Sequence, residues 1–494
     1  MKDLIRMSLQ NKIALKGNKL FISALLFSFA FCLIGILFPK NVVGGLSFVN
    51  AFILSKFSIF YQYLGLIIVL ISVIVFFVPF SKNKLGAEPP EYSFFSWIAL
   101  LYSTGMGSGL LLRAVQEPMF YYQNSPVQGI EKKSLALQYT FFHWGLTPWA
   151  MYSLFGLIVS YGLYIQKKEN FLEAITGFSQ KNYVKVVIPV FIIIITIAGV
   201  IASLGLGTGQ FIAGINYYFK WNLGYISLLL TALFIGVVGT LSALTGISKV
   251  IKYLADFDVI GSLILLIFVA LFLDFGEFAT NMASAFKRYI LHFFEMSLSI
   301  GDYHASEDFT NNWTVFYWAF WLAWVPFTGI FIARISKGRS IREYLIATIF
   351  IPAIASMFWF SVFGNNAFGK VKDFSDPIFK DVFSSMFVFL ELHPFSSITV
   401  LLAIVLILIA IINSVDSAIY VLSMFSDGGN ENPSKNHKLL WGAIITTTSI
   451  GLMALGTDDL LNAISNLLII FALPFSILYI YMITLFLTKY FKKT

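Results

Sequence analysis

Charged residues and cysteine are scarce in this chain. Asp, Glu, Lys and Arg make up 12% of its 494 residues, about half the proportion of a soluble domain. So few charges cannot cover the surface of a soluble protein of this length, which argues against a soluble enzyme, a disordered chain and a nucleic-acid-binding protein. The single cysteine, Cys32, also excludes an intramolecular disulfide.

Hydrophobic residues, in contrast, make up 58% of the chain, and 53 residues are Phe. A membrane-spanning helix needs about 20 apolar residues. Segments of that length predict an all-α integral membrane protein with about twelve transmembrane helices. Their predicted extents are 20–38, 60–80, 94–118, 137–164, 187–216, 222–242, 258–275, 313–333, 343–363, 397–424, 438–456 and 463–488.

Lys and Arg are distributed unevenly between the two sides of the predicted membrane. If the N-terminus lies inside, the inner segments carry about twice as many of these residues as the outer loops, which is typical of cytoplasmic segments. We therefore predict a multi-pass protein of the cell (plasma or inner) membrane with both termini in the cytoplasm. Topology and attraction to anionic lipids explain the net charge of +8 better than a macromolecular partner does.

Two predicted helices contain breaks at corresponding places. The run Gly105–Gly109 interrupts the third helix, and Pro326 with Gly329 interrupts the eighth. Breaks five helices apart indicate a five-plus-five inverted repeat, the LeuT-like arrangement of many secondary transporters. The predicted units are two peripheral helices in 1–93, a first repeat in 94–275, an extracytoplasmic connection in 276–312, a second repeat in 313–488 and a short cytoplasmic tail in 489–494.

The segment 245–257, between the sixth and seventh predicted helices, has two interpretations. Lys249 and Lys252 lie three residues apart with apolar residues on the opposite side, as in an interfacial amphipathic helix. A plain loop is the alternative. The acidic connection that follows the seventh helix is expected to be a structured cover rather than a domain.

Tryptophan and tyrosine residues cluster within two predicted helices. In the fourth helix Trp144, Trp149 and Tyr152 lie on one broad face, and in the eighth Trp321 and Trp324 are three residues apart. A single Trp in mid-helix is usually a packing residue. Two helices that both carry such clusters indicate a box of ring faces, which is how proteins hold a quaternary ammonium group.

Glycines at 105, 107 and 109 weaken the third helix, because each costs about 1 kcal/mol relative to Ala. Their lack of side chains lets a ligand approach, and unwinding there frees carbonyl groups for a cation. The alternative is close helix packing through Gly105 and Gly109. For Gly205, Gly207 and Gly209 in the fifth helix we expect close packing, because no strand precedes them as in a phosphate loop.

Ionisable residues inside a membrane need a partner or a role. Arg113 and Glu117 are four residues apart on the third helix, and we expect a structural ion pair. His143 is expected to be a hydrogen-bonded structural residue rather than a proton relay. The group Asn413, Ser414 and Asp416 in the tenth helix could supply oxygen ligands for a small cation, or simply bridge helices.

Several of these runs, in this order, resemble the betaine/carnitine/choline transporter (BCCT) family, whose members are secondary transporters for quaternary-ammonium solutes. The matching runs are GMGSG at 105–109, HWGLTPW at 143–149 with Tyr152, SLGLG at 203–207, the Trp-rich stretch from Trp313 to Trp324 with the loop that ends at Arg339, and SDGGNENP at 426–433.

The resemblance implies an inverted-repeat core preceded by two extra helices and often assembled as a homotrimer. It implies no catalytic residue and no tightly bound cofactor, with sodium as the coupling ion. The residues implied to contact the substrate are Trp144, Trp149, Tyr152, Trp321, Trp324, Gly105, Gly107 and Gly109.

In sodium-coupled members of this family, one ion lies between the third and tenth helices. The resemblance maps this first sodium site to Ser103, Met106, Ala410, Asn413 and Ser414. A second site maps to Thr196 and Phe327, although Val200 stands where that site would have a hydroxyl and cannot coordinate an ion. In sodium-independent members a basic side chain substitutes for sodium, and here the fifth and tenth predicted helices contain no Lys or Arg.

We therefore predict a secondary active transporter that imports glycine betaine, or a related zwitterion, by sodium symport with alternating access. Choline carries a net positive charge, and residues 103–112 contain no carboxylate that would favour it. The alternatives within the family are a sodium-independent exchanger for carnitine or betaine and a choline uptake transporter. Those from other classes are a channel and an intramembrane enzyme.

Overall fold

The computed structural model describes residues 26, 30, 33–35, 37–106, 109–177, 184–245, 248–371, 379, 381–427, 429–430, 432–455 and 460–491. Within these residues nearly every segment is helical, and the β-type pairing is limited to one antiparallel bridge between Lys84 and Ser340. The prediction of an all-α protein is confirmed. Helices suit lipid because they satisfy the backbone N–H and C=O groups within one segment.

The longest helices are α2, α9, α20 and α22, and short helices connect or extend the others. In chain order the α-helices are α2 (Pro39–Phe77), α3 (Phe94–Met106), α4 (Gly109–Arg113), α5 (Gln116–Gln123), α6 (Lys132–Trp144), α7 (Leu146–Ser160), α8 (Phe171–Thr176), α9 (Val184–Phe219), α10 (Tyr225–Thr245), α11 (Ser248–Ala270), α12 (Phe275–Leu291), α13 (Phe293–Leu298), α14 (Glu307–Phe309), α15 (Phe316–Ile335), α16 (Ile341–Leu345), α17 (Ile351–Lys370), α19 (Ser385–Glu391), α20 (Ser396–Ser426), α21 (Lys435–Met453) and α22 (Leu460–Tyr490). The 3-10 helices are η1 (Pro79–Lys82) and η3 (Gly301–Tyr303), and the π-helical turns are η2 (Tyr161–Ile165), η4 (Thr310–Val315) and η5 (Ile346–Phe350).

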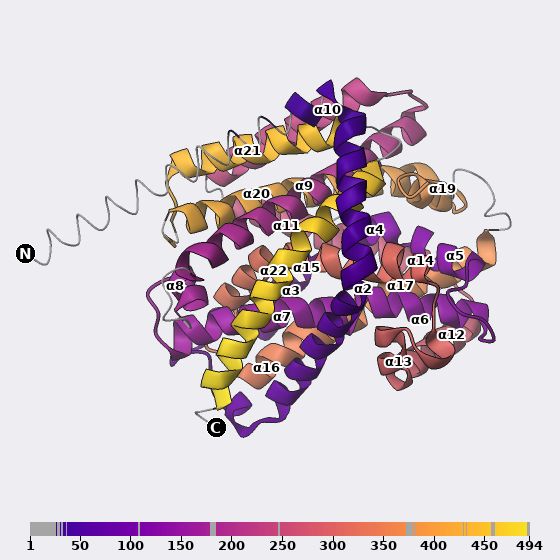
Figure 1. Cartoon of the computed structure of the whole chain (residues 1–494). Coiled ribbons are helices and arrows are strands. Elements are labelled where there is room, and N and C mark those ends of the chain that lie inside the picture. The colour runs from indigo at the N-terminus through magenta and orange to yellow at the C-terminus, as the bar shows by residue number, and fades with distance from the viewer. Residues whose placement is uncertain are drawn as a thin grey trace, which may run out of the picture.

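Eight helices or continuous helix pairs in the described part of the chain are long and apolar enough to cross a membrane, and the bent pair of α11 and α12 would be a ninth. The first predicted span, 20–38, lies mostly outside the described residues, so the total of about twelve stays a prediction. Most of the second predicted span, residues 60–77, lies in α2, which begins earlier, at Pro39, and runs along one side of the bundle (Figure 1).

The predicted break in the eighth helix is wrong. α15 continues through Pro326 without interruption. A proline inside a membrane helix is tolerated where neighbouring helices and local backbone adjustments satisfy the freed carbonyl. The irregular backbone lies earlier, in the π-helical η4, which leads directly into α15.

Gly329 has a packing role in place of the predicted break. A Cβ atom there would lie 2.6 Å from Cδ1 of Phe155 and 3.1 Å from the backbone nitrogen of Gly156. A Cβ on Gly156 would lie 2.8 Å from the carbonyl oxygen of Gly329. The two glycines therefore allow α7 and α15 to approach closely, as small residues do in membrane proteins.

The third predicted helix covers α3, α4 and the start of α5. Part of the predicted break at Gly105–Gly109 lies outside the described residues, because positions 107 and 108 are not among them. A described turn at 114–115 separates α4 from α5. Arg113 lies before this turn and Glu117 lies after it, so the two residues do not share one continuous helix.

α15 lies inside the bundle and packs against α7, α9 and α22 (Figure 1). α9 also packs against α20, α21 and α22. The contact between α9 and α15 is close, because a Cβ on Gly199 of α9 would lie 2.7 Å from the carbonyl oxygen of Ala323 of α15. The expected close packing of the fifth predicted helix is seen at Gly209 as well, where a Cβ would lie 2.8 Å from the ring of Phe383.

Residues 248–257 form the first turns of α11 and continue into it without a break. Residues 248–257 are therefore helical rather than a plain loop, and their position at the membrane interface stays a prediction. An amphipathic helix, α12, follows α11 and is bent by 115° from it.

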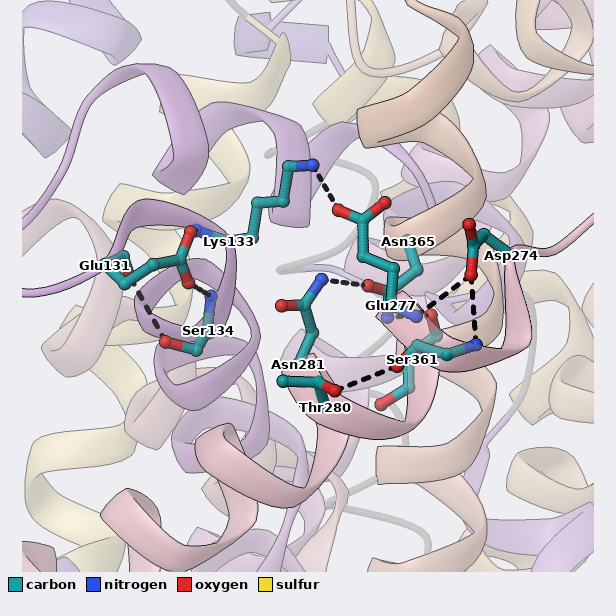
Figure 2. A network of polar contacts seen from close by, with 10 residues as sticks. Glu131, Lys133, Ser134, Asp274, Glu277, Thr280, Asn281, Ser361 and Asn365 are labelled. Atoms are coloured by element: carbon teal, nitrogen blue, oxygen red, sulfur yellow. Dashed lines mark hydrogen bonds and ion pairs between the residues drawn. The ribbon is translucent and has the colours of Figure 1, made fainter.

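Polar contacts fasten α12 to two other helices (Figure 2). The carboxylate of Asp274 caps the start of α12 by accepting two backbone N–H groups at 3.0 Å each. Lys133 of α6 forms an ion pair with Glu277, and the amide of Asn281 donates to Oδ1 of Asn365 of α17 at 2.7 Å. α12 thus packs against both α6 and α17.

Candidate functional site

The predicted aromatic residues come from three helices that meet inside the bundle. Trp144 is the last residue of α6, Trp149 and Tyr152 lie in α7, and Trp321 and Trp324 lie in α15. All five are buried. Because α7 and α15 approach closely at their glycines, rings from the two helices come into contact.

Four of these rings form a chain of edge-to-face contacts. The ring centroids of Trp144 and Trp321 are 5.0 Å apart with the planes at 80°. Tyr152 contacts Trp321 at 6.1 Å and 85°, and Trp149 contacts Tyr152 at 5.8 Å and 89°. The structure therefore brings together Trp144, Trp149, Tyr152 and Trp321 as the sequence predicts, in the geometry that aromatic pairs prefer.

Trp324 lies on the same helix but in a neighbouring cluster. Its ring is 5.9 Å from that of Phe320 and 5.0 Å from that of Phe327. Phe320 in turn contacts Trp321 at 5.1 Å. Trp324 is thus connected to the four-ring chain through an intervening phenylalanine.

A cavity opens beside these two clusters. Trp149 and Tyr152 lie outside its lining, and Tyr152 supports Trp321 from behind. The lining residues are Gly109, Leu112, Arg113, Trp144, Ser203, Leu206, Phe316, Tyr317, Phe320, Trp321 and Trp324. A Cβ on Gly109 would lie 3.2 Å from Cη2 of Trp144, so the glycine leaves room for that indole.

Tyr317 is a member of the site that the sequence analysis missed. Its ring stacks on Trp321 at 6.0 Å and 19° and contacts Trp144 at 5.6 Å and 66°. The signal was available, because Tyr317 precedes Trp321 by four residues and therefore lies on the same face of α15. Trp144, Tyr317 and Trp321 are the ring system that faces the cavity.

Glu117 is the second missed residue, and it is fully buried behind these rings. Its Oε2 accepts a hydrogen bond from Nε1 of Trp144 at 2.9 Å and another from the hydroxyl of Tyr317. Hydrogen bonds to a carboxylate are stronger than those between neutral groups. Glu117 therefore fixes the orientation of two of the three rings that face the cavity.

The predicted ion pair between Arg113 and Glu117 is wrong. Within the described residues no carboxylate lies in ion-pair contact with Arg113. The turn at 114–115 interrupts the helix on which the two residues would have been neighbours. Arg113 instead donates to Oε1 of Gln116 at 2.7 Å and lies over the ring of Trp313 at 5.2 Å.

His143 is hydrogen-bonded through both ring nitrogens, as expected for a structural residue. Nδ1 is 2.8 Å from the hydroxyl of Tyr121, and Nε2 is 3.1 Å from Oγ1 of Thr314. Nδ1 is also 3.7 Å from Oε1 of Glu117. The backbone carbonyl of His143 accepts from Nε1 of Trp321 at 2.9 Å, so this part of α6 orients α15 as well.

The residues of the first predicted sodium site are divided between α3 and α20. Ser103 and Met106 belong to α3, with side chains outside the described part of the chain. Of the glycines predicted to contact the substrate, Gly105 also belongs to α3 and Gly107 lies outside the described residues. Ala410, Asn413 and Ser414 belong to α20, where Oγ of Ser414 donates to the carbonyl of Ala410 at 2.9 Å. No described contact joins the two groups, and the first site stays a prediction.

The residues of the second predicted sodium site lie on α9 and α15, which pack against each other. Thr196 and Val200 are on α9, one turn apart, and Phe327 is on α15. The hydroxyl of Thr196 is buried and has no hydrogen-bond partner among the described residues. An unpaired buried hydroxyl is costly, and the second site stays a prediction.

Residues 19–494 match the model of the betaine/carnitine/choline family of transporters. The chain belongs to this family. It is a multi-pass membrane transporter, not an enzyme. It is 33% identical to the glycine betaine transporter OpuD of Bacillus subtilis over 91% of this chain and 90% of that protein.

Two further relatives have broader or different names. The chain is 32% identical to a glycine betaine/proline/choline/ectoine transporter of Vibrio parahaemolyticus, over 90% of this chain and 82% of that protein. It is 30% identical to the ectoine/hydroxyectoine transporter of Virgibacillus pantothenticus, over 96% of this chain and 97% of that protein.

Proposed function

We propose that this BCCT transporter imports a quaternary-ammonium zwitterion, with glycine betaine as its substrate. The observation that carries this proposal is the ring system of Trp144, Tyr317 and Trp321 beside a cavity, in which Glu117 orients the first two rings. A trimethylammonium group cannot donate hydrogen bonds, and electron-rich ring faces are the groups that bind it. Relatives named for glycine betaine transport support the same substrate.

Glu117 strengthens the ring faces as cation binders. A carboxylate that accepts from an indole N–H and a phenol O–H shifts electron density toward the two rings. Its negative charge also lies directly behind them, in surroundings of low polarity where charges interact strongly. The site therefore offers a positively charged methylammonium group both ring faces and a nearby counter-charge.

Sodium is the coupling ion in our proposal, and it is a transported substrate rather than a resident metal. Support comes from Thr196, whose buried hydroxyl lacks a partner among the described residues beside α15. The described residues also contain no cluster of three His, Cys, Asp or Glu that would favour a transition metal. Oxygen ligands are those that a hard cation such as sodium prefers.

Substrate and ion would be carried by alternating access, in which one helix bundle rocks against the other around the site. The same proposal places the protein in the cell membrane with both termini in the cytoplasm and with basic inner loops near anionic lipid. The proposal also includes the homotrimer that the family resemblance implies. Native mass spectrometry of the solubilised protein should give the mass of three chains, and a monomer would contradict the trimer.

The test of the transport proposal is uptake of radiolabelled glycine betaine into proteoliposomes. Uptake should require an inward sodium gradient and should be competed by carnitine more than by choline. Uptake that ignores sodium but depends on preloaded substrate would show the exchanger instead. No uptake of glycine betaine, carnitine or choline under either condition would overturn the proposed function.

A further inference from the structure

We infer that Arg113 binds the anionic group of the substrate and thereby selects zwitterions over quaternary-ammonium cations. This inference rests on the proposed function, because it assumes that the ring system beside Arg113 holds an ammonium group. It concerns the opposite end of the same substrate.

The side chain of Arg113 lies beside the ring system. Arg113 lines the same cavity as Trp144, Tyr317 and Trp321. It is the last residue of α4, and the turn at 114–115 directs the chain away before α5 begins. A ligand in the cavity can therefore contact the ring system and this guanidinium at the same time.

Arg113 has more hydrogen-bond donors than its described partner uses. A guanidinium carries five N–H donors in a planar fork. The described partner of these donors is Oε1 of Gln116, and the face of the group lies over Trp313. The contact with Trp313 holds the group in place without using its N–H donors. Donors remain for a carboxylate, which a guanidinium binds through two parallel hydrogen bonds.

The charges of Arg113 and Glu117 lie at different places in the site. A positive charge within a membrane protein is costly unless a counter-charge or a function compensates it. The nearest acidic residue in sequence, Glu117, is directed instead to the ring system, where it accepts from Trp144 and Tyr317. The cavity thus has a carboxylate behind its ring faces and a guanidinium in its lining, a polarity that matches a zwitterion.

This arrangement changes the expectation based on residues 103–112. That stretch has no carboxylate, and its absence is the sequence argument against choline. The structure supplies a more direct argument, because the positive charge of Arg113 repels a ligand with a net positive charge. Glycine betaine and choline carry the same trimethylammonium group and differ in the carboxylate, so their comparison isolates the contribution of Arg113.

The experiment measures the dissociation constants of glycine betaine and choline with purified protein, by tryptophan fluorescence and by titration calorimetry. The variants are Arg113→Gln, which removes the charge, and Arg113→Lys, which keeps the charge but loses the fork. Arg334→Gln is the matched control, because Arg334 lies at the end of α15 away from the cavity lining and donates to Tyr420 at 2.8 Å.

The unmodified protein should bind glycine betaine at least tenfold more tightly than choline. Arg113→Gln should weaken glycine betaine binding at least tenfold while leaving choline binding equal or tighter, and Arg113→Lys should give an intermediate ratio. The control should leave the ratio unchanged. If the folding of Arg113→Gln is impaired, the intermediate ratio of Arg113→Lys still decides the matter.

Equal weakening of both ligands would assign Arg113 a structural role and overturn the inference. An unchanged ratio in both Arg113 variants would overturn it as well, while glycine betaine binding by the unmodified protein would leave the proposed function intact. Failure of the unmodified protein to bind either ligand would overturn the proposed function and this inference together.

Discussion

Nε1 of Trp144 donates a hydrogen bond to Oε2 of Glu117 at 2.9 Å, which joins the end of α6 to the start of α5 behind the cavity. The same oxygen accepts from Tyr317. One buried carboxyl group therefore sets the orientation of rings from two different helices. These two hydrogen bonds give the acidic side chain partners at a fully buried position of a membrane protein.

Two replacements of Glu117 should distinguish the effect of its charge from the effect of its hydrogen bonds. In Glu117→Ala both donors lose their acceptor, which costs about 1–3 kcal/mol for each unsatisfied group. We expect at least a tenfold rise in the KM for glycine betaine and a lower Tm. Glu117→Gln keeps a carbonyl oxygen for both donors but removes the charge, so it should raise the KM with a smaller loss of Tm. Equal effects of the two variants on both quantities would contradict this separation.

Trp321 should be the most sensitive ring of the site, because it contacts Trp144, Tyr152 and Tyr317 and faces the cavity. In Trp321→Leu the lost ring face should weaken substrate binding by about 1–2 kcal/mol, roughly five- to thirtyfold. Binding is measured by calorimetry on the purified protein.

The matched control for that variant is Trp359→Leu. Trp359 is buried in α17, packs against Phe363 at 4.6 Å and lies outside the cavity lining. Its replacement should lower the Tm and leave the affinity unchanged. Equal loss of affinity in both variants would show that Trp321 acts through general packing.

Gly329 should tolerate no side chain, because a Cβ there would meet Phe155 at 2.6 Å. We expect Gly329→Ala to destabilise the protein by about 1–3 kcal/mol through overpacking between α7 and α15. Gly44→Ala is the control, since a Cβ on Gly44 meets no atom within 4 Å in the described structure. That variant should be neutral or stabilising by up to about 1 kcal/mol. A thermal unfolding series in detergent compares the two, and an unchanged Tm for Gly329→Ala would disprove the close crossing.

Thr196 should determine the sodium dependence of uptake. Thr196→Val removes the hydroxyl and keeps the shape, so the sodium concentration for half-maximal uptake should rise about fivefold or more, the loss expected for one weak ligand contact. Thr448→Val is the control, because that buried hydroxyl donates to the carbonyl of Ile444 at 2.6 Å on another helix. If both variants keep the sodium dependence of the unmodified protein, Thr196 is not a ligand.

The aromatic cluster could be predicted because its signal is local. Trp321 and Trp324 lie three residues apart on one helix, and Trp149 and Tyr152 do so on another, so helical periodicity placed each pair on one face. The contacts that complete the site are not local. Glu117 is 27 residues from Trp144 and 200 residues from Tyr317 in the sequence. A periodic sequence pattern cannot predict contacts between residues so far apart.

Two local rules failed for physical reasons that only the packed structure reveals. The four-residue spacing of Arg113 and Glu117 predicted an ion pair, but a turn at 114–115 removes the helix that the rule assumes. Pro326 predicted a break, but α15 is surrounded by other helices and continues through it. In both cases tertiary packing decided a feature that the sequence pattern left open.

The ring faces should bind a positively charged methylammonium group, and a comparison of glycine betaine with a neutral-headed analogue tests this most directly. The compound 3,3-dimethylbutanoate has the shape and carboxylate of glycine betaine, with a neutral carbon in place of the quaternary nitrogen. Calorimetry should show that it binds the purified protein at least tenfold more weakly than glycine betaine, because it lacks the charge that the rings attract. Equal affinity of the two compounds would show that the site recognises shape and carboxylate alone, and would contradict the account.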